Sequence, residues 1–252
     1  MSDFTFKDVL TGILKFNDEN VMHIGFDTDS EDIIITNWNA AAGTSKTLQT
    51  NMNSSGSGYS NDDIASHAFT GDVVLESATT IHGSAFEDSF ITSASGLTPT
   101  KIKGSAFRDC PDLVSVEFPN VTDMSAANNV FSGCSELKSV KLPKLSNISS
   151  STNIASSCPK LEVFDAGVIG SMTNNFFNGD SALRTLILRK TGSICTTNWA
   201  SSAVFGGIYD NPAESKIYVP EDLISTYQAA TNWSALYTLG VTFAKIEGSI
   251  YE

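Results

Sequence analysis

Three of the four cysteines in this 252-residue chain are evenly spaced, and their thiols are the first candidates for chemistry. Cys110, Cys134 and Cys158 follow one another at a constant step (134 − 110 = 24; 158 − 134 = 24). Zinc needs four ligands that converge on one point, whereas a constant step predicts a straight column of thiols about 5 Å apart. We therefore predict a column of small buried thiols and no metal site. A disulfide between neighbouring repeats is the geometric alternative.

The three histidines, His23, His67 and His82, belong to no catalytic sequence pattern. The chain contains no G-x-S-x-G, H-E-x-x-H or Walker phosphate-binding sequence. His67 and His82 lie close to Ala-Phe pairs that recur along the chain, which indicates ordinary variation within a repeat. The sequence predicts neither an enzyme nor a cofactor, and a hydrolase that uses carboxylates is the remote alternative.

A dense run of side-chain oxygens occupies residues 27–32, with the sequence DTDSED. Calcium prefers such oxygen ligands. The run lacks the glycine and the later glutamate of an EF-hand loop. We therefore interpret it as an acidic surface turn and not as a metal site.

The elements that position the cysteines repeat with them. A leucine follows each cysteine by three residues, and an apolar residue follows it by six, in the copies CPDLVSVEFPNV, CSELKSVKLPKL, CPKLEVFDAGVI and the degenerate DSALRTLILRKT. Each copy contains one short segment of alternating apolar residues, which is typical of a strand. A single strand cannot bury its apolar face alone, so we predict stacked coils with a parallel sheet on one side. The recurring phenylalanines predict an aromatic spine on the other side.

Two phrases of the repeat, AFRDCPDLVSVEFPNVT and VFSGCSELKSVKLPKLS, resemble the BspA-like class of leucine-rich repeats. The 24-residue step lies inside the 20–29 residue range of leucine-rich repeats. The ending KIYVPEDLISTYQAATNWSALYTL resembles the closing segment common in that family, and the likeness covers roughly residues 62–247. The resemblance implies a mainly β, right-handed solenoid with minor α structure, found in bacterial and often surface-associated proteins used for adhesion or recognition.

The pattern divides the chain into three parts. Residues 61–215 are predicted to form the solenoid, and residues 1–60 an N-terminal cap or small irregular segment, with a separate small domain as the alternative. Within this N-terminal part we expect a short helix over residues 4–16 and strands over 21–26 and 33–38. Residues 216–252 are predicted to form a C-terminal cap, with a strand at 216–219, a helix that begins at Pro220 and a last strand over 241–246.

The residues between the inward-facing positions of the strands are expected to point outward. Down the stack they form one row of Glu117, Lys141, Asp165 and Ile187, and a second row of Val114, Lys138, Glu162 and Arg184. Charges alternate along both rows, so each acid is expected beside a base on the next strand. Two interpretations remain open, a self-neutralised soluble face and a ligand surface on the concave side.

The net charge of −13 disfavours nucleic acid as a partner, because phosphate backbones are repelled. No stretch reaches the roughly 20 apolar residues that a membrane helix needs, and the first residues do not form a secretory signal. The resemblance nevertheless implies a location outside the cell or on its surface. The leading hypothesis is a non-catalytic binding or adhesion module for a protein or glycan. The alternative is a structural or assembly component of a phage particle or multi-protein surface complex.

Overall fold

The computed structural model describes residues 9–16, 20–27, 32–37, 70–75, 79–81, 83–125, 127–148, 153–172 and 175–252. Between residues 9 and 37, and at residue 70, only the backbone is described. None of the helices in these ranges is long and apolar enough to cross a bilayer.

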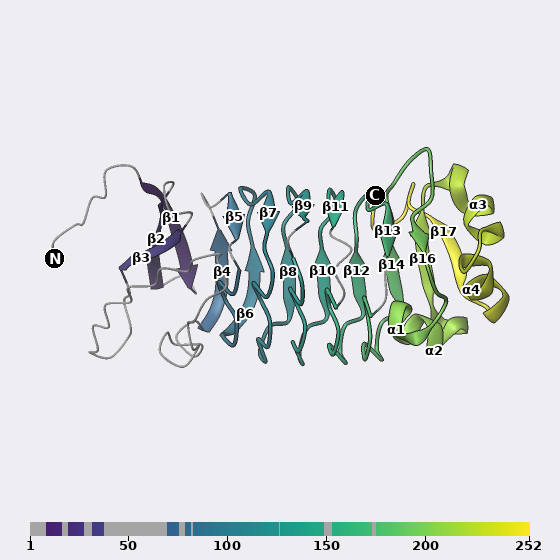
Figure 1. Cartoon of the computed structure of the whole chain (residues 1–252), viewed down its shortest axis with the longest axis horizontal. Coiled ribbons are helices and arrows are strands. Elements are labelled where there is room, and N and C mark those ends of the chain that lie inside the picture. The colour runs from purple at the N-terminus through teal and green to yellow at the C-terminus, as the bar shows by residue number, and fades with distance from the viewer. Residues whose placement is uncertain are drawn as a thin grey trace.

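Within the described ranges, eleven strands form one continuous sheet along the length of the molecule (Figure 1). Its parallel part consists of β4 (Thr70–Leu75), β6 (Phe90–Ser95), β8 (Ser115–Glu117), β10 (Ser139–Lys141), β12 (Val163–Asp165), β14 (Thr185–Ile187), β16 (Lys216–Val219) and β17 (Thr242–Lys245). Equivalent residues pair directly, so Val116 lies beside Val140 and Val140 beside Phe164. The predicted parallel sheet is confirmed, and the coils follow one another along a nearly straight line in Figure 1.

The N-terminal strands extend the same sheet by antiparallel pairing. They are β1 (Val9–Phe16), β2 (Asn20–Asp27) and β3 (Asp32–Asn37), and β1 pairs with β4. The helix expected over residues 4–16 is therefore wrong where the backbone is described. Residues 11–12 are the weak helix formers Thr and Gly, while the edge of β4 offers unpaired backbone groups that a strand can satisfy.

Short strands form a second, narrower side of each coil. They are β5 (Thr80–Ile81), β7 (Lys101–Ile102), β9 (Asp123–Met124) and β11 (Asn147–Ile148), with a separate pair β13 (Ser171–Met172) and β15 (Thr196–Thr197). Hydroxyl groups strengthen this side, because Thr100 donates to the carbonyl of Thr79 and Ser146 to that of Thr122. The side chains of one coil thus bond the backbone of the preceding coil.

The coil interior contains the aromatic spine that the sequence predicts. The rings of Phe86, Phe107 and Phe131 are stacked, with centroid distances of 5.3 Å and 5.7 Å between neighbours. Farther along, Phe164, Phe176 and Phe177 meet edge to face at 4.8–6.0 Å. Such pairs add to the hydrophobic stabilisation from burying the rings.

The turn that carries the spine uses a left-handed backbone conformation twice in each coil. The first position is occupied by Ser84, Ser105, Asn129, Asn153 and Asn175, and the second, four residues later, by Asp88, Asp109, Gly133, Ser157 and Gly179. Their φ angles lie between +54° and +87°. Only glycine and short polar residues adopt this conformation at low cost, which explains the residue types at these places.

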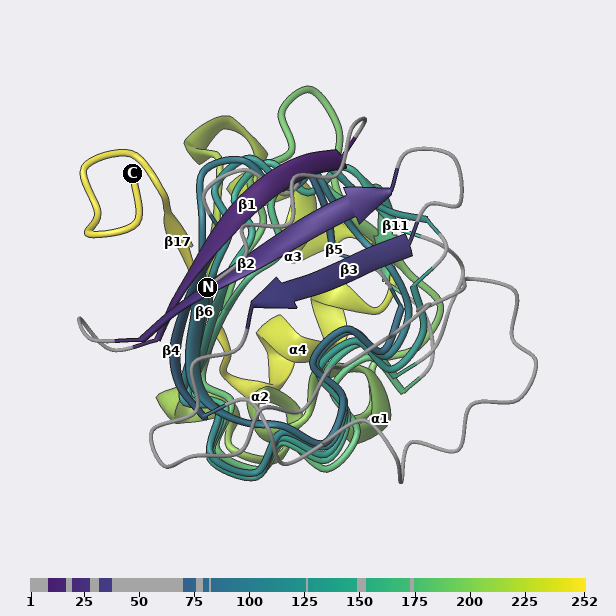
Figure 2. The same cartoon turned by 90° about the vertical axis from the view of Figure 1, so that its left-hand side faces the viewer.

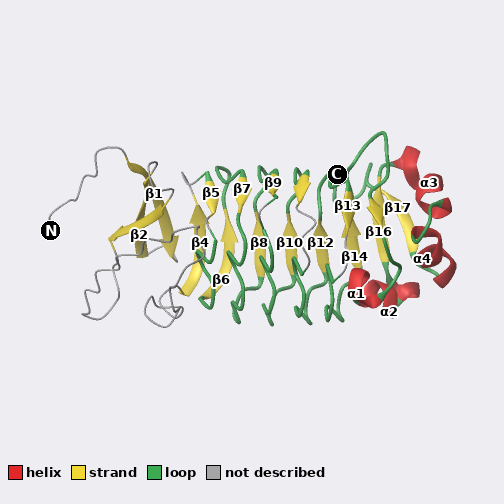
Figure 3. Cartoon of the chain, viewed as in Figure 1, coloured by secondary structure: helices red, strands yellow, loops and turns green. Residues whose placement is uncertain are grey.

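Among the residues that the structure describes, helices occur only at the C-terminal end (Figure 3). They are α1 (Ser202–Phe205), α2 (Gly207–Asp210), α3 (Ile224–Ala229) and α4 (Trp233–Leu239), with the 3-10 turns η1 (Pro212–Glu214) and η2 (Glu221–Leu223). The single helix expected from Pro220 is instead η2 and α3, and α4 begins after Asn232, whose φ of +67° interrupts the helix. Trp233 is buried and donates from Nε1 to the carbonyl of Cys195 at 2.8 Å, which fixes this cap on the last coil.

Candidate functional site

The outer face of the large sheet presents the first predicted row of residues. Parallel pairing places Glu117 beside Lys141, Lys141 beside Asp165 and Asp165 beside Ile187, and Tyr218 of β16 continues the row. The intervening inward residues of these strands are buried. Strand alternation therefore aligns the row as the sequence predicts.

Over β8 and β10 this row is open to solvent. Lys141 Nζ lies 3.1 Å from a carboxylate oxygen of Glu117, and both side chains are more than half exposed. This inter-strand pair is the arrangement that charge alternation predicts. An exposed pair contributes about 0.2–1 kcal/mol, so it does little for stability and remains available to a ligand.

Asp165 has a different environment. Its residue is only 5% exposed, and it accepts two hydrogen bonds from Arg189 Nε and one at 2.7 Å from Arg189 Nη2. It also accepts a bond from the backbone N–H of Gly167. Asp165 keeps its predicted place in the outer row, but the expected pairing with Lys141 is wrong, because Arg189 folds over the carboxylate and buries it. Arg189 occupies the position that Pro119 and Pro143 hold in earlier repeats, and this substitution was visible in the sequence.

Ile187 is also covered. It belongs to the outer row, yet it is 0% exposed and lies outside the hydrophobic core cluster of the coils. The carbonyl of Tyr251 accepts a hydrogen bond from Arg189 Nη2 at 2.5 Å, and the ring of Tyr251 lies 4.8 Å from that of Tyr218. The C-terminal residues thus return to the outer face, where Figure 2 shows them as a loop beside the sheet.

The second predicted row is less regular. Val114, Lys138 and Glu162 are exposed, with Val114 at 38%. Arg184 is half-buried, and its charged partner is Glu214 at 3.7 Å, on a segment beyond the sheet. The expected acid–base alternation is therefore wrong at Arg184, whose guanidinium also donates to the carbonyls of Ser181 and Leu183.

The cysteine column has a uniform geometry. All four cysteines are free and buried. The thiols of Cys110, Cys134 and Cys158 each lie 2.8–3.0 Å from the carbonyl of a spine phenylalanine in the preceding coil. Burial raises the pKa of the Cys134 thiol well above its usual value, which keeps it protonated as a donor. The described residues include no group of three or more His, Cys, Asp or Glu side chains placed to hold a metal.

The comparison with protein families agrees with this geometry. Residues 79–199 match the model of the BspA type leucine rich repeat region in six copies. This segment belongs to the BspA-type leucine-rich repeats. No curated protein matches the sequence. The repeat family is generally non-catalytic, and leucine-rich repeats serve protein binding.

One BspA-type repeat places a carboxyl group in the cysteine column. Asp180 stands three residues before Leu183, as Cys158 stands before Leu161, and it is 0% exposed. Its Oδ1 accepts from the N–H of Cys158 at 2.7 Å, and within the described structure Oδ2 has no hydrogen-bond partner. Burial raises the pKa of Asp180 to about 8, so the neutral form is favoured at pH 7.

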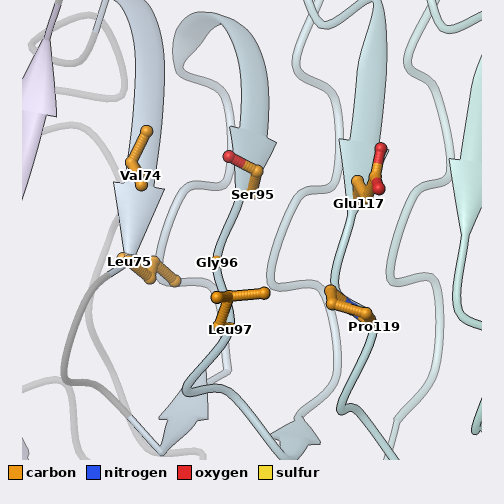
Figure 4. Close-up of a pocket in the computed structure, with 7 residues that line it drawn as sticks. All are labelled: Val74, Leu75, Ser95, Gly96, Leu97, Glu117 and Pro119. Atoms are coloured by element: carbon orange, nitrogen blue, oxygen red, sulfur yellow. The ribbon is translucent and has the colours of Figure 1, made fainter.

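A shallow hollow of about 530 Å³ lies at the N-terminal end of the repeats (Figure 4). It is lined by Val74, Leu75, Ser95, Gly96, Leu97, Glu117 and Pro119. Gly96 has no alternative here, since a Cβ would lie 2.3 Å from the carbonyl oxygen of Leu75. Leu97 is 73% exposed, which adds an apolar side chain next to the Glu117 end of the outer face.

Other sequence candidates lie elsewhere. The acidic turn at residues 28–31 and the side chains of His23, His67 and His82 are outside the described residues. Trp199 is 59% exposed at the end of the matched repeats and stands apart from the predicted rows in sequence. The described geometry therefore directs attention to the outer sheet face.

Proposed function

We propose that this chain is a non-catalytic binding module that recognises a protein or glycan through the outer face of its sheet. The supporting observation is the open area over β8, β10 and β12. Glu117 and Lys141 are exposed on adjacent strands, and Val114, Lys138 and Glu162 are exposed directly before the three strands. Main-chain hydrogen bonds to the neighbouring coils hold the backbone of these residues, so little backbone entropy remains to be lost on binding. The mixture of one apolar and several charged groups suits a polar, reversible interface.

The proposal includes a location outside the cell or on its surface, which the family resemblance supports. Labelling of intact producing cells with a membrane-impermeant amine reagent tests this part. Labelled protein in intact cells supports a surface location, and protein labelled only after lysis contradicts it.

The test of binding is an array of extracellular-matrix proteins and glycans probed with purified protein. The site variant carries Glu117→Ala, Lys138→Ala and Lys141→Ala. The matched control carries Glu136→Ala and Lys160→Ala, which remove another exposed inter-coil ion pair of 2.6 Å that lies before the strands.

Saturable binding that is lost in the site variant and kept in the control supports the proposal. Binding that survives in both variants moves the site to the loops or caps. The absence of saturable binding across the array contradicts recognition and favours the structural or assembly role.

A further inference from the structure

The last residues of the chain lie against the outer face as a small folded segment. We define the C-terminal segment as residues 248–252. The N–H of Ser249 donates to the carbonyl of Ile246, and the N–H of Gly248 donates to a carboxylate oxygen of Glu252. These bonds are local, so residues 246–252 form a turn.

The hydrogen bond and the ring contact that join this segment to the sheet both involve one residue. Tyr251 accepts from Arg189 through its carbonyl and packs its ring against Tyr218 at an interplanar angle of 64°. Ile250, its neighbour, is 90% exposed. The segment is therefore held on the sheet by one aromatic side chain and one main-chain carbonyl.

The surface beneath Tyr251 has the composition of a binding hot spot. Ile187 supplies an outward apolar side chain, Tyr218 an aromatic ring and Arg189 hydrogen-bond donors. Arg189 is already oriented by its bonds to the buried Asp165, so it needs no ordering when it meets a carbonyl. Tyrosine and arginine are enriched in such hot spots.

The burial of Ile187 shows that the C-terminal segment lowers the solvent exposure of the outer face at β14. In the same row Glu117 and Lys141 are exposed, whereas Ile187 is 0% exposed although it lies outside the core cluster. Tyr218 and Arg189 flank Ile187, and both contact Tyr251. We attribute the burial of Ile187 to these three side chains.

We propose that Ile187, Arg189 and Tyr218 form a docking site for a turn-forming polypeptide segment of a partner, and that the C-terminal segment occupies this site in its absence. The ligand is an aromatic residue whose own main-chain carbonyl accepts from Arg189 while its ring packs on Tyr218. The inference rests on the proposed binding function and specifies its partner class as protein. The partner segment exchanges with Tyr251, which makes binding competitive with the chain's own end.

The test uses an acetylated peptide with the sequence of residues 247–252, EGSIYE, and a control peptide in which tyrosine is alanine. Each is titrated into ¹⁵N-labelled full-length protein, and amide shifts in two-dimensional NMR spectra are followed. The proteins are the wild type, Tyr251→Ala, and Tyr251→Ala combined with Tyr218→Ala. The last variant removes the ring of the site but keeps the Arg189–Asp165 pair, so the fold is not put at risk.

We expect the tyrosine peptide to shift amides of β12, β14 and β16 saturably in Tyr251→Ala. Its affinity for the wild type should be about tenfold lower, because the tethered segment competes at an effective concentration in the millimolar range. The alanine peptide and the Tyr218→Ala double variant should each weaken binding about tenfold or more. Equal affinity for wild type and Tyr251→Ala, shifts elsewhere on the solenoid, or no saturation at the peptide's solubility limit would each overturn the proposal.

Failure of this inference and failure of the proposed function give different results. Array binding supports the proposed function if it is lost on substitution of Glu117, Lys138 and Lys141. If the same binding is unchanged by Tyr218→Ala, the docking site is contradicted. If the peptide binds at β14 and β16 but the array shows no ligand, the docking site is supported. The proposal of recognition through the open area over β8, β10 and β12 is then contradicted.

Discussion

The regular coils (residues 105–166) and the last coil (residues 175–190) share one backbone plan but differ at three equivalent positions. The cysteine becomes Asp180, the outer charged residue becomes Ile187, and the proline becomes Arg189. Each changed residue lies at a junction. Asp180 contacts Gly206 and accepts from the N–H of Gly207 where α1 meets α2, whereas Ile187 and Arg189 lie under the C-terminal residues. The position in the repeat therefore determines whether a side chain points into the coil or out of it. The structure that covers that position determines which residue type can occupy it.

The largest effect in this comparison is expected at Asp180. Burial raises the pKa of Asp180 from an ordinary 3.8 to about 8, so its contribution to stability is complete below pH 4 and is lost as pH rises toward 8. Asp180→Asn removes the titrating group and should stabilise the protein at pH 7 by up to about 4 kcal/mol. Urea unfolding at pH 4, 7 and 9 measures this.

The matched control is Asp112→Asn, which changes an exposed carboxylate of a regular coil. We expect Asp180→Asn to lose the decline in stability between pH 4 and 8, while Asp112→Asn keeps it. A stability–pH slope that is the same in Asp180→Asn and wild type would show that Asp180 ionises normally.

The next effect concerns the two ion pairs of the outer face. Arg189→Gln leaves Asp165 buried without its cation and should destabilise the fold by about 3 kcal/mol. Lys141→Gln removes the cation of an exposed pair and should cost less than about 1 kcal/mol. Chemical unfolding of both variants at one pH compares them directly. Equal losses of unfolding free energy in the two variants would mean that Arg189 and the C-terminal segment do not exclude water from Asp165.

A smaller effect is expected at the left-handed turn residues, which the regular coils and the last coil share. Asn129 in a regular coil and Asn175 in the last coil have φ angles of +54° and +62°. Replacement of either by alanine should cost about 1–2 kcal/mol, because alanine disfavours the left-handed region. The corresponding glycine variants serve as controls and should lose less. Thermal unfolding that separates the two alanine variants by more than this range would contradict a common backbone.

The smallest effect is the coupling between Glu117 and Lys141. A double-mutant cycle with Glu117→Gln and Lys141→Gln should give about 0.2–1 kcal/mol, which added salt reduces. A coupling energy above 2 kcal/mol would indicate that this part of the face is not freely solvated. The cycle thus checks the openness on which the binding proposal depends.

Much of the fold was predictable because it depends on local periodicity. The 24-residue step gave the strands, the thiol column and the alignment of Glu117 with Lys141, all of which follow from equivalent residues stacking. The cap helices and the strand at residues 216–219 followed from apolar spacing. The break before α4 was missed, since it depends on the left-handed Asn232, and the short helices α1 and α2 were not predicted.

The errors arose where distant segments meet. The burial of Asp165 requires Arg189, which is 24 residues away, and Tyr251, which is farther still and has no periodic signal. The helix expected in the N-terminal part became β1 because β4 offers a sheet edge, a tertiary influence that apolar spacing does not contain. Asp180 was visible in the aligned repeat, but its raised pKa follows from burial alone.

The in-register pairing of the coils also bears on how such a chain can lengthen. Because Ser115, Ser139 and Val163 pair residue for residue, duplication of one 24-residue unit within the regular coils adds a strand whose two neighbours already fit it. The same duplication of the last coil would place a second Asp180 against a coil instead of against Gly206, where an added Cβ would lie 3.2 Å from the Cβ of Asp180. The regular coils are therefore the part of the molecule in which a duplicated unit would find matching strands on both sides.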